Sequence, residues 1–323
     1  MKVHAMSGWR RHIVEGLKEG LAKGWRSFLW VLKIILPVSL LTALLEYSGV
    51  LGYLDGLLAP LMGLMGLPSI AAFPIVAGAL AGVYAAVAAL AVLPLSQAQM
   101  TLVAIFVLIS HMLIQEGIIQ AKSGFHIGKA TVVRLTAAVA TVTLCSLFLS
   151  TGVDSTAAAP VSAAARQELA IMLGNWLIAM GRLSLKILWI VMSIMIGLAW
   201  MRRFDLIPHL VRWMRPVLAM LGLGPKVGVL WLSAVLFGVT YGAAVIVEEF
   251  RAGSFEQREI ERLHVSIGIN HSMVEDPLLF LPLGIGMFWL YIPRLVAAMV
   301  AVRIYDAIEF LVQGRRLKAH RQA

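Results

Sequence analysis

Ten apolar stretches separated by short polar or charged segments make up most of this 323-residue chain. A helix needs about 20 apolar residues to cross the hydrocarbon core of a bilayer, and only the stretches around Pro60 and Pro216 are clearly shorter. The pattern predicts helical segments over 26–47, 51–66, 69–91, 98–120 and 128–149, and again over 182–201, 205–221, 227–248, 262–281 and 285–310. It therefore predicts an all-α polytopic membrane protein.

An internal repeat organises these segments. Four pairs of residues recur in the same order: Pro60 and Pro216, Gly82 and Gly238, His111 and His271, and Arg134 and Arg294. The first two pairs are offset by 156 residues and the last two by 160, so four residues are inserted between them. The charged loop "EEFRAGSFEQREIER" is the natural place for this insertion. Such self-similarity indicates a duplication.

The repeat sets the predicted domain boundaries. Residues 1–24 lack the apolar core of a signal peptide, but they carry apolar residues at helical spacing between basic ones, which predicts an amphipathic helix on the membrane surface. A first repeat over 25–150 follows, then a small-residue linker over 151–165. The second repeat covers 166–312, and a basic cytoplasmic tail covers 313–323.

The loop charges predict the orientation. Short cytoplasmic loops carry an excess of Lys and Arg, and this rule favours ten crossings over eight, with both termini in the cytoplasm of a bacterial cell. The residues placed on the cytoplasmic side are Lys122, Lys129, Arg202, Arg203, Arg251, Arg258, Arg262, Arg315, Arg316 and Lys318. Five crossings in each repeat would invert the second repeat relative to the first. Secondary transporters commonly have this design, with sites at the repeat interface and short or broken helices.

The composition excludes several classes of protein. Hydrophobic residues make up 60% of the chain and charged residues 14%, whereas soluble proteins average about 25% charged. The net charge of +10 lies at the termini and in short loops, so the lipid bilayer rather than a nucleic acid is the expected partner. Cys145 is the single cysteine, which excludes a disulfide framework. Enzyme motifs for phosphates, dinucleotides or serine nucleophiles are absent from the sequence, so no enzyme is expected.

Two polar clusters stand inside the apolar segments: "SHMLIQE" from Ser110 and "NHSMVED" from Asn270. Ionisable residues deep in a membrane segment cost about 2.5 to 3.5 kcal/mol each, so they indicate function. On a continuous helix, His271 and Glu275 share one face, and Pro277 loosens the backbone behind them. The predicted substrate or ion site at the repeat interface comprises His111, Gln115, Glu116, Asn270, His271, Glu275 and Asp276.

The chemistry of this site stays open at this stage. His111, Glu116, His271 and Glu275 suit a divalent ion such as Zn, Mn or Fe, and no other cofactor is expected. The same groups could shuttle protons or hold a small polar solute by hydrogen bonds. They could also simply hold the two halves together.

Five further residues are secondary candidates. Tyr84 and Tyr241 follow the matched glycines and could line a cavity, and Glu248 lies seven residues from Tyr241 on the same helical face. Arg134 and Arg294 are either snorkelling anchors or partners of the buried carboxylates, and the second role is favoured slightly.

The segments "LFGVTYGAAVIVEEFRAG" and "GINHSMVEDPLLFLPLGIGMFWLYIPRL" resemble the bacterial nucleoside-recognition or Gate-domain family. That family is related to spore maturation proteins and to the membrane gates of ferrous-iron permeases. The resemblance covers 30–145 and 185–305, most strongly the second range, and implies a paired-Gate inverted-repeat fold without fixing a substrate. It gives no support to iron transport through cysteines, because Cys145 stands alone.

Together these features predict a secondary transporter of the bacterial inner membrane, of alternating-access type, for a cation or a small polar solute. The alternative is a non-transporting scaffold or accessory protein with a structural polar core. An intramembrane enzyme is less favoured because the sequence offers no identifiable nucleophile. A homo-oligomer is compatible with the sequence, which does not decide the oligomeric state.

Overall fold

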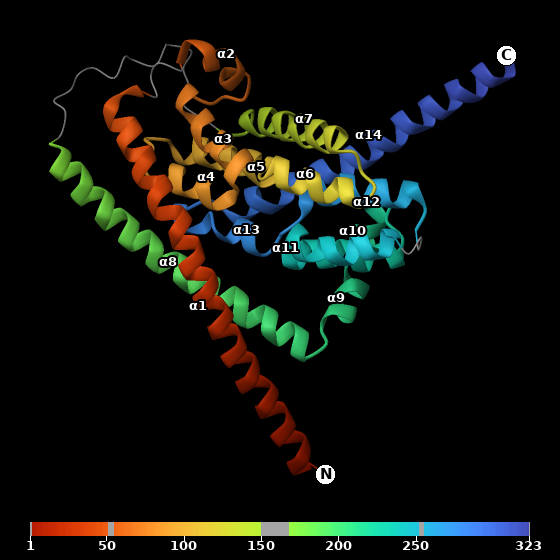
Figure 1. Ribbon diagram of the computed structural model, residues 1–323, viewed down its shortest axis with the longest axis horizontal. Helices are drawn as coiled ribbons and strands as arrows, with labels where there is room; N and C mark the ends of the chain where they lie inside the picture. Colours follow the sequence, from red (N-terminus) through yellow and green to blue (C-terminus); the bar gives the residue numbers. More distant parts are fainter. Residues whose placement is uncertain (1, 51–54, 150–167, 252–254, 323) are drawn as a thin grey trace.

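The computed structural model describes residues 2–50, 55–149, 168–251 and 255–322, and every regular element among them is helical (Figure 1). The predicted all-α class is thus confirmed, and the predicted linker over 151–165 lies outside the described residues. The elements are α1 (Lys2–Ser48), α2 (Asp55–Leu64), η2 (Ser69–Ala71), α3 (Ala72–Ala81), α4 (Val83–Leu90), α5 (Gln97–Ser110), α6 (Leu113–Lys122), α7 (Ile127–Ser146), α8 (Leu169–Arg203), α9 (Ile207–Trp213), α10 (Arg215–Met220), α11 (Pro225–Arg251), α12 (Gln257–Asn270), α13 (Glu275–Leu278), η3 (Leu281–Leu283) and α14 (Met287–Gln322).

The long helices α1 and α8 pack antiparallel beside a bundle formed by the other helices (Figure 1). Trp176 Nε1 near the start of α8 donates to Ser39 Oγ in the second half of α1, at 3.2 Å. A Cβ atom on Gly20 would lie 2.5 Å from the Cα atom of Ile196, so the missing side chain allows the two backbones to touch. Helix α1 thus continues through the predicted boundary at residue 24, and Gly16, Gly20 and Gly24 face α8. Its position on a membrane surface stays a prediction.

The repeat seen in the sequence recurs in the helices. Both α5 and α12 begin with a capping box, Ser96 with Gln99 and Glu256 with Glu259, which satisfies free N–H groups at a helix start. These helices begin 160 residues apart, and so do α7 and α14. The first helices of the two halves, α1 and α8, run in opposite directions. The opposite orientation of the two halves in a membrane stays a prediction.

Four of the predicted segments are broken near their middle. Gly82 (φ 93°) separates α3 from α4, and Gly238 (φ 76°) interrupts α11. Met112 (φ 47°) separates α5 from α6, and Ser272 (φ 48°) follows the end of α12. The left-handed backbone at Met112 is stabilised because its N–H donates to the Gly78 carbonyl at 3.1 Å. The breaks of one half therefore lie against each other.

The described residues contain fewer candidate spans than the sequence predicted. Among these residues, five helical stretches are long and apolar enough to cross a membrane: Trp9–Ser48, Gln97–Lys122, Ile127–Ser146, Leu169–Arg203 and Met287–Leu311. The second of these comprises α5 and α6 with the break at Met112 between them. A sixth results if Leu58–Leu64 and Ser69–Ala81, which are bent by 86°, count as one span. The sequence predicted ten crossings, because hydropathy cannot distinguish two half-helices joined at a break from one helix.

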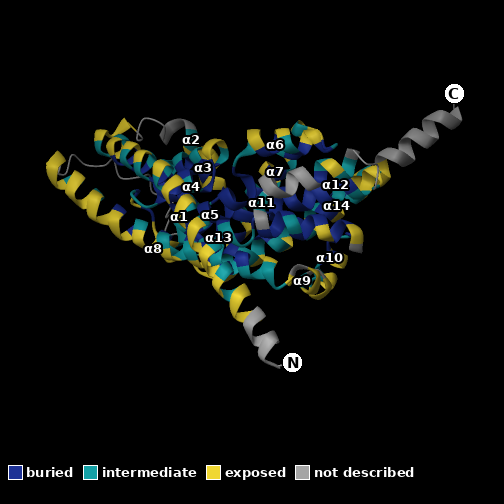
Figure 2. Cartoon of the chain, turned by 60° about the horizontal axis from the view of Figure 1, so that its bottom comes forward, coloured by how far each residue is buried: buried dark blue, intermediate teal, exposed yellow. Residues whose placement is uncertain are grey.

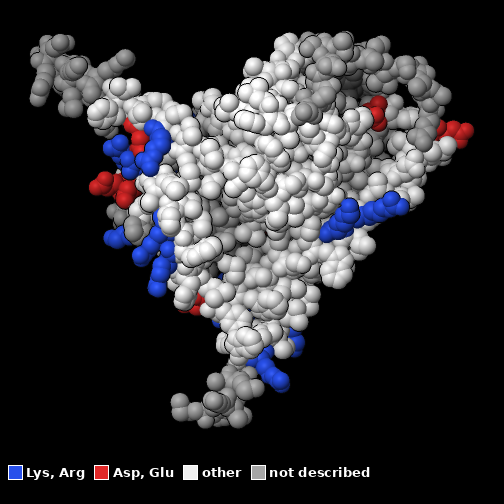
Figure 3. Space-filling model, turned by 180° about the vertical axis from the view of Figure 1, so that it is seen from behind, with Lys and Arg blue, Asp and Glu red and all other residues white. Residues whose placement is uncertain are grey.

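Burial is concentrated where the broken helices meet. Figure 2 shows the most buried residues along α4, α5 and α12, whereas much of α1 and α8 is exposed. Large apolar side chains on the surface include Trp189 (70% exposed) and Phe310 (73% exposed). In Figure 3 the charged side chains of the described residues lie mostly towards the margins of a broad face without Lys, Arg, Asp or Glu. Lipid is the natural cover for such a surface, as expected of a multi-pass membrane protein.

Candidate functional site

The site is built at two helix ends. His111 directly follows the last residue of α5, and His271 directly follows the last residue of α12; both have an extended backbone. Each ring turns back onto its own helix, with Nδ1 of His111 3.0 Å from the Val107 carbonyl oxygen and Nδ1 of His271 2.7 Å from that of Ile267. The same contact thus positions both histidines.

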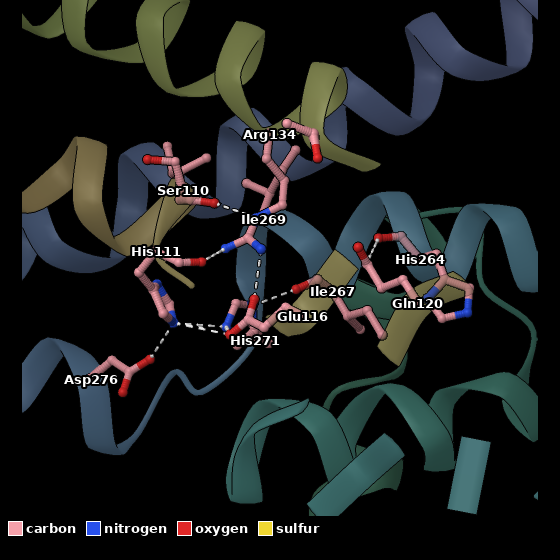
Figure 4. Close-up of polar contacts among 12 residues, drawn as sticks. Ser110, His111, Glu116, Gln120, Arg134, His264, Ile267, Ile269, His271 and Asp276 are labelled. Atoms are coloured by element: carbon pink, nitrogen blue, oxygen red, sulfur yellow. Dashed lines mark hydrogen bonds and ion pairs between the residues drawn. The ribbon is translucent and has the colours of Figure 1, made fainter. Parts of the chain in front are cut away.

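The two histidine rings contact each other in the interior. Their Nε2 atoms lie 3.0 Å apart, and their ring centroids 4.7 Å apart (Figure 4). His111 is 3% exposed and His271 1% exposed. One ring comes from each half of the repeat, so the contact lies where the halves join.

Two carboxylates complete this centre. Glu116, on α6, places Oε1 3.0 Å from His271 Nε2 and 3.4 Å from His111 Nε2. Asp276, on α13, places Oδ2 3.2 Å from His111 Nε2. Each carboxylate therefore contacts the histidine of the opposite half, and Glu116 also contacts that of its own half. We call His111, Glu116, His271 and Asp276 the central cluster.

Two buried arginines hold the helix ends in place. Arg134 donates to the carbonyls of Ile109 and His111, at 2.9 and 2.6 Å, and Arg294 donates to those of Ile269 and His271, at 3.2 and 2.9 Å. These carbonyls stand where the helices end, so no following helical turn supplies N–H groups to them. Positive charge at a helix C-terminus is also favourable.

The arginines differ in their carboxylate contacts. Arg134 Nη1 lies 2.7 Å from Glu116 Oε2, whereas Nη1 of Arg294 has no hydrogen-bond partner among the described residues. Both side chains are at most 1% exposed. Snorkelling anchors are therefore excluded, and the favoured carboxylate partnership is observed for Arg134 alone.

The central cluster has more hydrogen-bond acceptors than donors. A carbonyl oxygen can only accept, so Nδ1 of each neutral histidine must carry the hydrogen and Nε2 must present a lone pair. Two lone pairs then face each other at 3.0 Å, beside two carboxylate oxygens. Four acceptor atoms converge without a donor between them. A bound cation or an added proton is what this arrangement stabilises.

The structure separates the predicted site residues into two groups. Gln115 is exposed on α6, and Glu275 accepts a hydrogen bond from the Tyr84 hydroxyl instead of contacting His271. The argument from a shared helical face is wrong here because the helix ends at His271. Asn270 is fully buried, and its side-chain nitrogen and oxygen have no hydrogen-bond partner among the described residues.

The remaining candidates either lie away from the central cluster or have side chains outside the described residues. Glu248 is exposed on α11, and the Tyr241 side chain lies outside the described residues. Tyr84 is linked to the polar region only through Glu275. Of the predicted metal ligands, His111, Glu116 and His271 come together and Glu275 does not. Asp276 takes that place: its carboxylate oxygen and one nitrogen of each histidine lie within 4.8 Å of one another, which suits a metal ion.

A second polar group adjoins the centre on the α6 side. Gln120 donates to the His264 carbonyl at 3.1 Å, and Nε2 of His264 lies 3.0 Å from the Ser123 hydroxyl (Figure 4). The Phe125 ring stacks on His264 at 5.6 Å between centroids. Gln120 was missed from the sequence, although its position four residues after Glu116 places both on one helical face.

Comparisons with known proteins agree with this architecture. Residues 28–153 match the protein family described as Gate, nucleoside recognition. A relative from Bacillus subtilis (strain 168), described as the uncharacterized membrane protein YvoD, is 30% identical over 283 residues, which are 87% of this chain and 91% of the relative. This similarity therefore extends across both halves of the repeat. No solved structure matches the chain.

Proposed function

The chain belongs to the Gate (nucleoside recognition) family of membrane proteins, and from that premise we propose that it is a secondary transporter of alternating-access type for a cation. The central cluster is its binding site. The observation that carries the proposal is the convergence of four acceptor atoms, two from each half, at the junction of broken helices.

The placement of the ligands on two halves supports transport. His111 and Glu116 belong to the first half, and His271 and Asp276 to the second. A movement of one half relative to the other would therefore separate the ligands and release the ion. Broken helices at a repeat interface are the usual setting for such sites, because irregular backbone is tolerated where it lines a site.

The burial of the centre supports an occluded state. The four side chains of the central cluster are at most 12% exposed. In an alternating-access cycle the site is closed to both sides at one stage. Gly82 and Gly238, with their left-handed backbone beside the helix ends, are the positions where a half could bend.

A purely structural core is less well supported. A polar group buried only to hold two halves together is normally paired with a group of complementary character. Arg134 and Glu116 satisfy that rule, but the facing Nε2 atoms of the two histidines do not. The proposal accordingly assigns binding, rather than catalysis or scaffolding, to these side chains.

Flux measurements in proteoliposomes test the proposal. The protein is reconstituted with a pH-sensitive dye or a metal-sensitive dye inside, and H⁺, Mn²⁺ and Zn²⁺ gradients are applied in turn. We expect saturable flux of at least one cation, lost in His271→Ala and Glu116→Gln. His264→Ala and Glu275→Gln serve as matched controls, because each removes a buried histidine or a neighbouring carboxylate outside the central cluster.

Two results would contradict the proposal. If folded wild-type protein moved none of these cations and no nucleoside, a non-transporting scaffold would be the better description. Flux that survives unchanged in folded His271→Ala would place the binding site elsewhere. Size-exclusion chromatography of each variant in detergent shows which ones are folded.

A further inference from the structure

We infer that the central cluster binds a divalent first-row transition-metal ion of the Zn²⁺, Mn²⁺ or Fe²⁺ class, through Nε2 of His111 and His271 and one oxygen each of Glu116 and Asp276. The inference deepens the proposed function, and its consequence for transport rests on that function. Binding itself is an equilibrium property and can be measured separately.

The distances fit a shared metal ion. Ligands at 2.0 to 2.2 Å in a tetrahedral arrangement lie about 3.3 to 3.6 Å from one another. The measured separations are 3.0 Å between the two Nε2 atoms, 3.0 and 3.4 Å from Glu116 Oε1 to them, and 3.2 Å from Asp276 Oδ2 to His111 Nε2. One nitrogen of each histidine and one Asp276 oxygen lie within 4.8 Å of one another, and Glu116 Oε1 lies within 3.4 Å of both nitrogens. One ion between the two rings would therefore contact both histidines, with a carboxylate from each half moving inward to complete the set.

The surroundings hold these ligands in their metal-binding form. Metal-bound histidine usually donates its other ring N–H to a carbonyl or carboxylate, which fixes the ring and its tautomer. Both histidines do so here, towards Val107 and Ile267. Glu116 offers Oε1 to the centre while Arg134 holds Oε2, so this carboxylate is oriented as a single-oxygen ligand.

The charge of the region favours a cation. Glu116, Glu275 and Asp276 bring three negative charges, and Arg134 and Arg294 bring two positive charges. The C-termini of α5 and α12 add about half a negative charge each, and the N-termini of α6 and α13 add about half a positive charge each. With neutral histidines the excess is about one negative charge, so the region attracts a cation and repels an anion.

The donor set selects the class of metal. Imidazole nitrogen with carboxylate oxygen suits Zn²⁺, Mn²⁺ and Fe²⁺. Ca²⁺ and Mg²⁺ prefer all-oxygen sites. The single cysteine, Cys145, is not part of the cluster that can hold a metal, so soft thiolate chemistry does not contribute.

Equilibrium binding to the full chain in detergent tests the inference. The protein is stripped with a chelator and dialysed against Zn²⁺ or Mn²⁺, and bound metal is counted by elemental analysis. We expect one ion per chain and affinity lowered at least 100-fold in His271→Ala and Asp276→Asn. His264→Ala and Glu275→Gln should bind within about threefold of the wild type.

Two further readouts separate ligation from a folding defect. Zn²⁺ should raise the thermal midpoint of the wild type and of Glu275→Gln, because a ligand that binds only the folded state stabilises it, but it should leave Asp276→Asn unchanged. X-ray absorption of the Zn²⁺ form should show nitrogen and oxygen neighbours at about 2.0 to 2.2 Å and no sulfur.

The outcomes distinguish this inference from the proposed function. Absence of stoichiometric Zn²⁺ and Mn²⁺ binding in the folded wild type would overturn the inference, and proton flux in that case would leave the transporter intact. Equal losses of affinity in Glu275→Gln and Asp276→Asn would also overturn it. Specific binding without flux would support the metal centre while refuting transport.

Discussion

Replacing Arg134 by methionine is the most direct test of how the centre is held. The guanidinium makes three contacts: with the carbonyls of Ile109 and His111 and with the carboxylate of Glu116, at 2.9, 2.6 and 2.7 Å. Methionine fills similar volume but offers no donor. The variant therefore leaves a buried carboxylate and two helix-end carbonyls without their charged partner.

The expected loss can be worked from these contacts. Removing one partner of a buried ion pair costs about 3 to 5 kcal/mol, because the remaining charge is uncompensated. Arg294→Met is the matched comparison, since it removes two carbonyl contacts at 3.2 and 2.9 Å and no ion pair among the described residues. Charged hydrogen bonds contribute about 1.5 to 3 kcal/mol each. Both variants lose two such bonds, and only Arg134→Met also loses a third charged contact, to Glu116. We therefore expect Arg134→Met to be the more destabilising by at least about 2 kcal/mol.

The double variant isolates the ion pair. In Arg134→Met with Glu116→Gln, the orphaned charge is gone and only neutral groups lack partners. This double variant should be about 2 kcal/mol more stable than Arg134→Met alone. The measurement is the free energy of unfolding by SDS titration in mixed micelles, with a chelator present and tryptophan fluorescence as the signal. A double variant no more stable than the single one, or equal losses at Arg134 and Arg294, would refute the reasoning.

Two glycine substitutions test the backbone by the same titration. Gly82→Ala should lower the free energy of unfolding by about 1 to 3 kcal/mol, because φ is 93° and the new Cβ would lie 3.1 Å from Met112. Gly63→Ala, whose Cβ meets nothing within 4 Å, should leave it unchanged. Equal stability of the two variants would contradict the strain assigned to Gly82. Gly20→Ala should cost about 1 to 3 kcal/mol by overpacking α1 against α8, and Gly181→Ala, which also has open space, is its control. If Gly20→Ala were as stable as the wild type, α1 and α8 would not be in close backbone contact at Gly20.

The fold class followed from the sequence because hydrophobicity alone sets it. Lipid removes water as a partner for backbone groups, so long apolar stretches must form helices. The duplication was also readable, since Gly82 and Gly238 or Arg134 and Arg294 keep their spacing. The positions where the helices break could not be predicted, because the break at Met112 depends on the carbonyl of Gly78 in another helix.

The candidate site was predicted in composition but not in geometry. His111, Glu116, His271 and Asp276 were recognised because ionisable groups in an apolar segment are costly. Helical spacing then chose Glu275 over Asp276 as the partner of His271, and the structure pairs Glu275 with Tyr84.

The sequence by itself determined that the chain is a helical membrane protein with two related halves and a buried His and carboxylate cluster. These properties depend on the identity and the spacing of residues. Only the tertiary structure decided that both helices end at their histidines, that Glu116 reaches the histidine of the other half, and that Arg134 closes the helix end. Those contacts join residues up to 155 positions apart, and their energies depend on directions that only the packed helices fix.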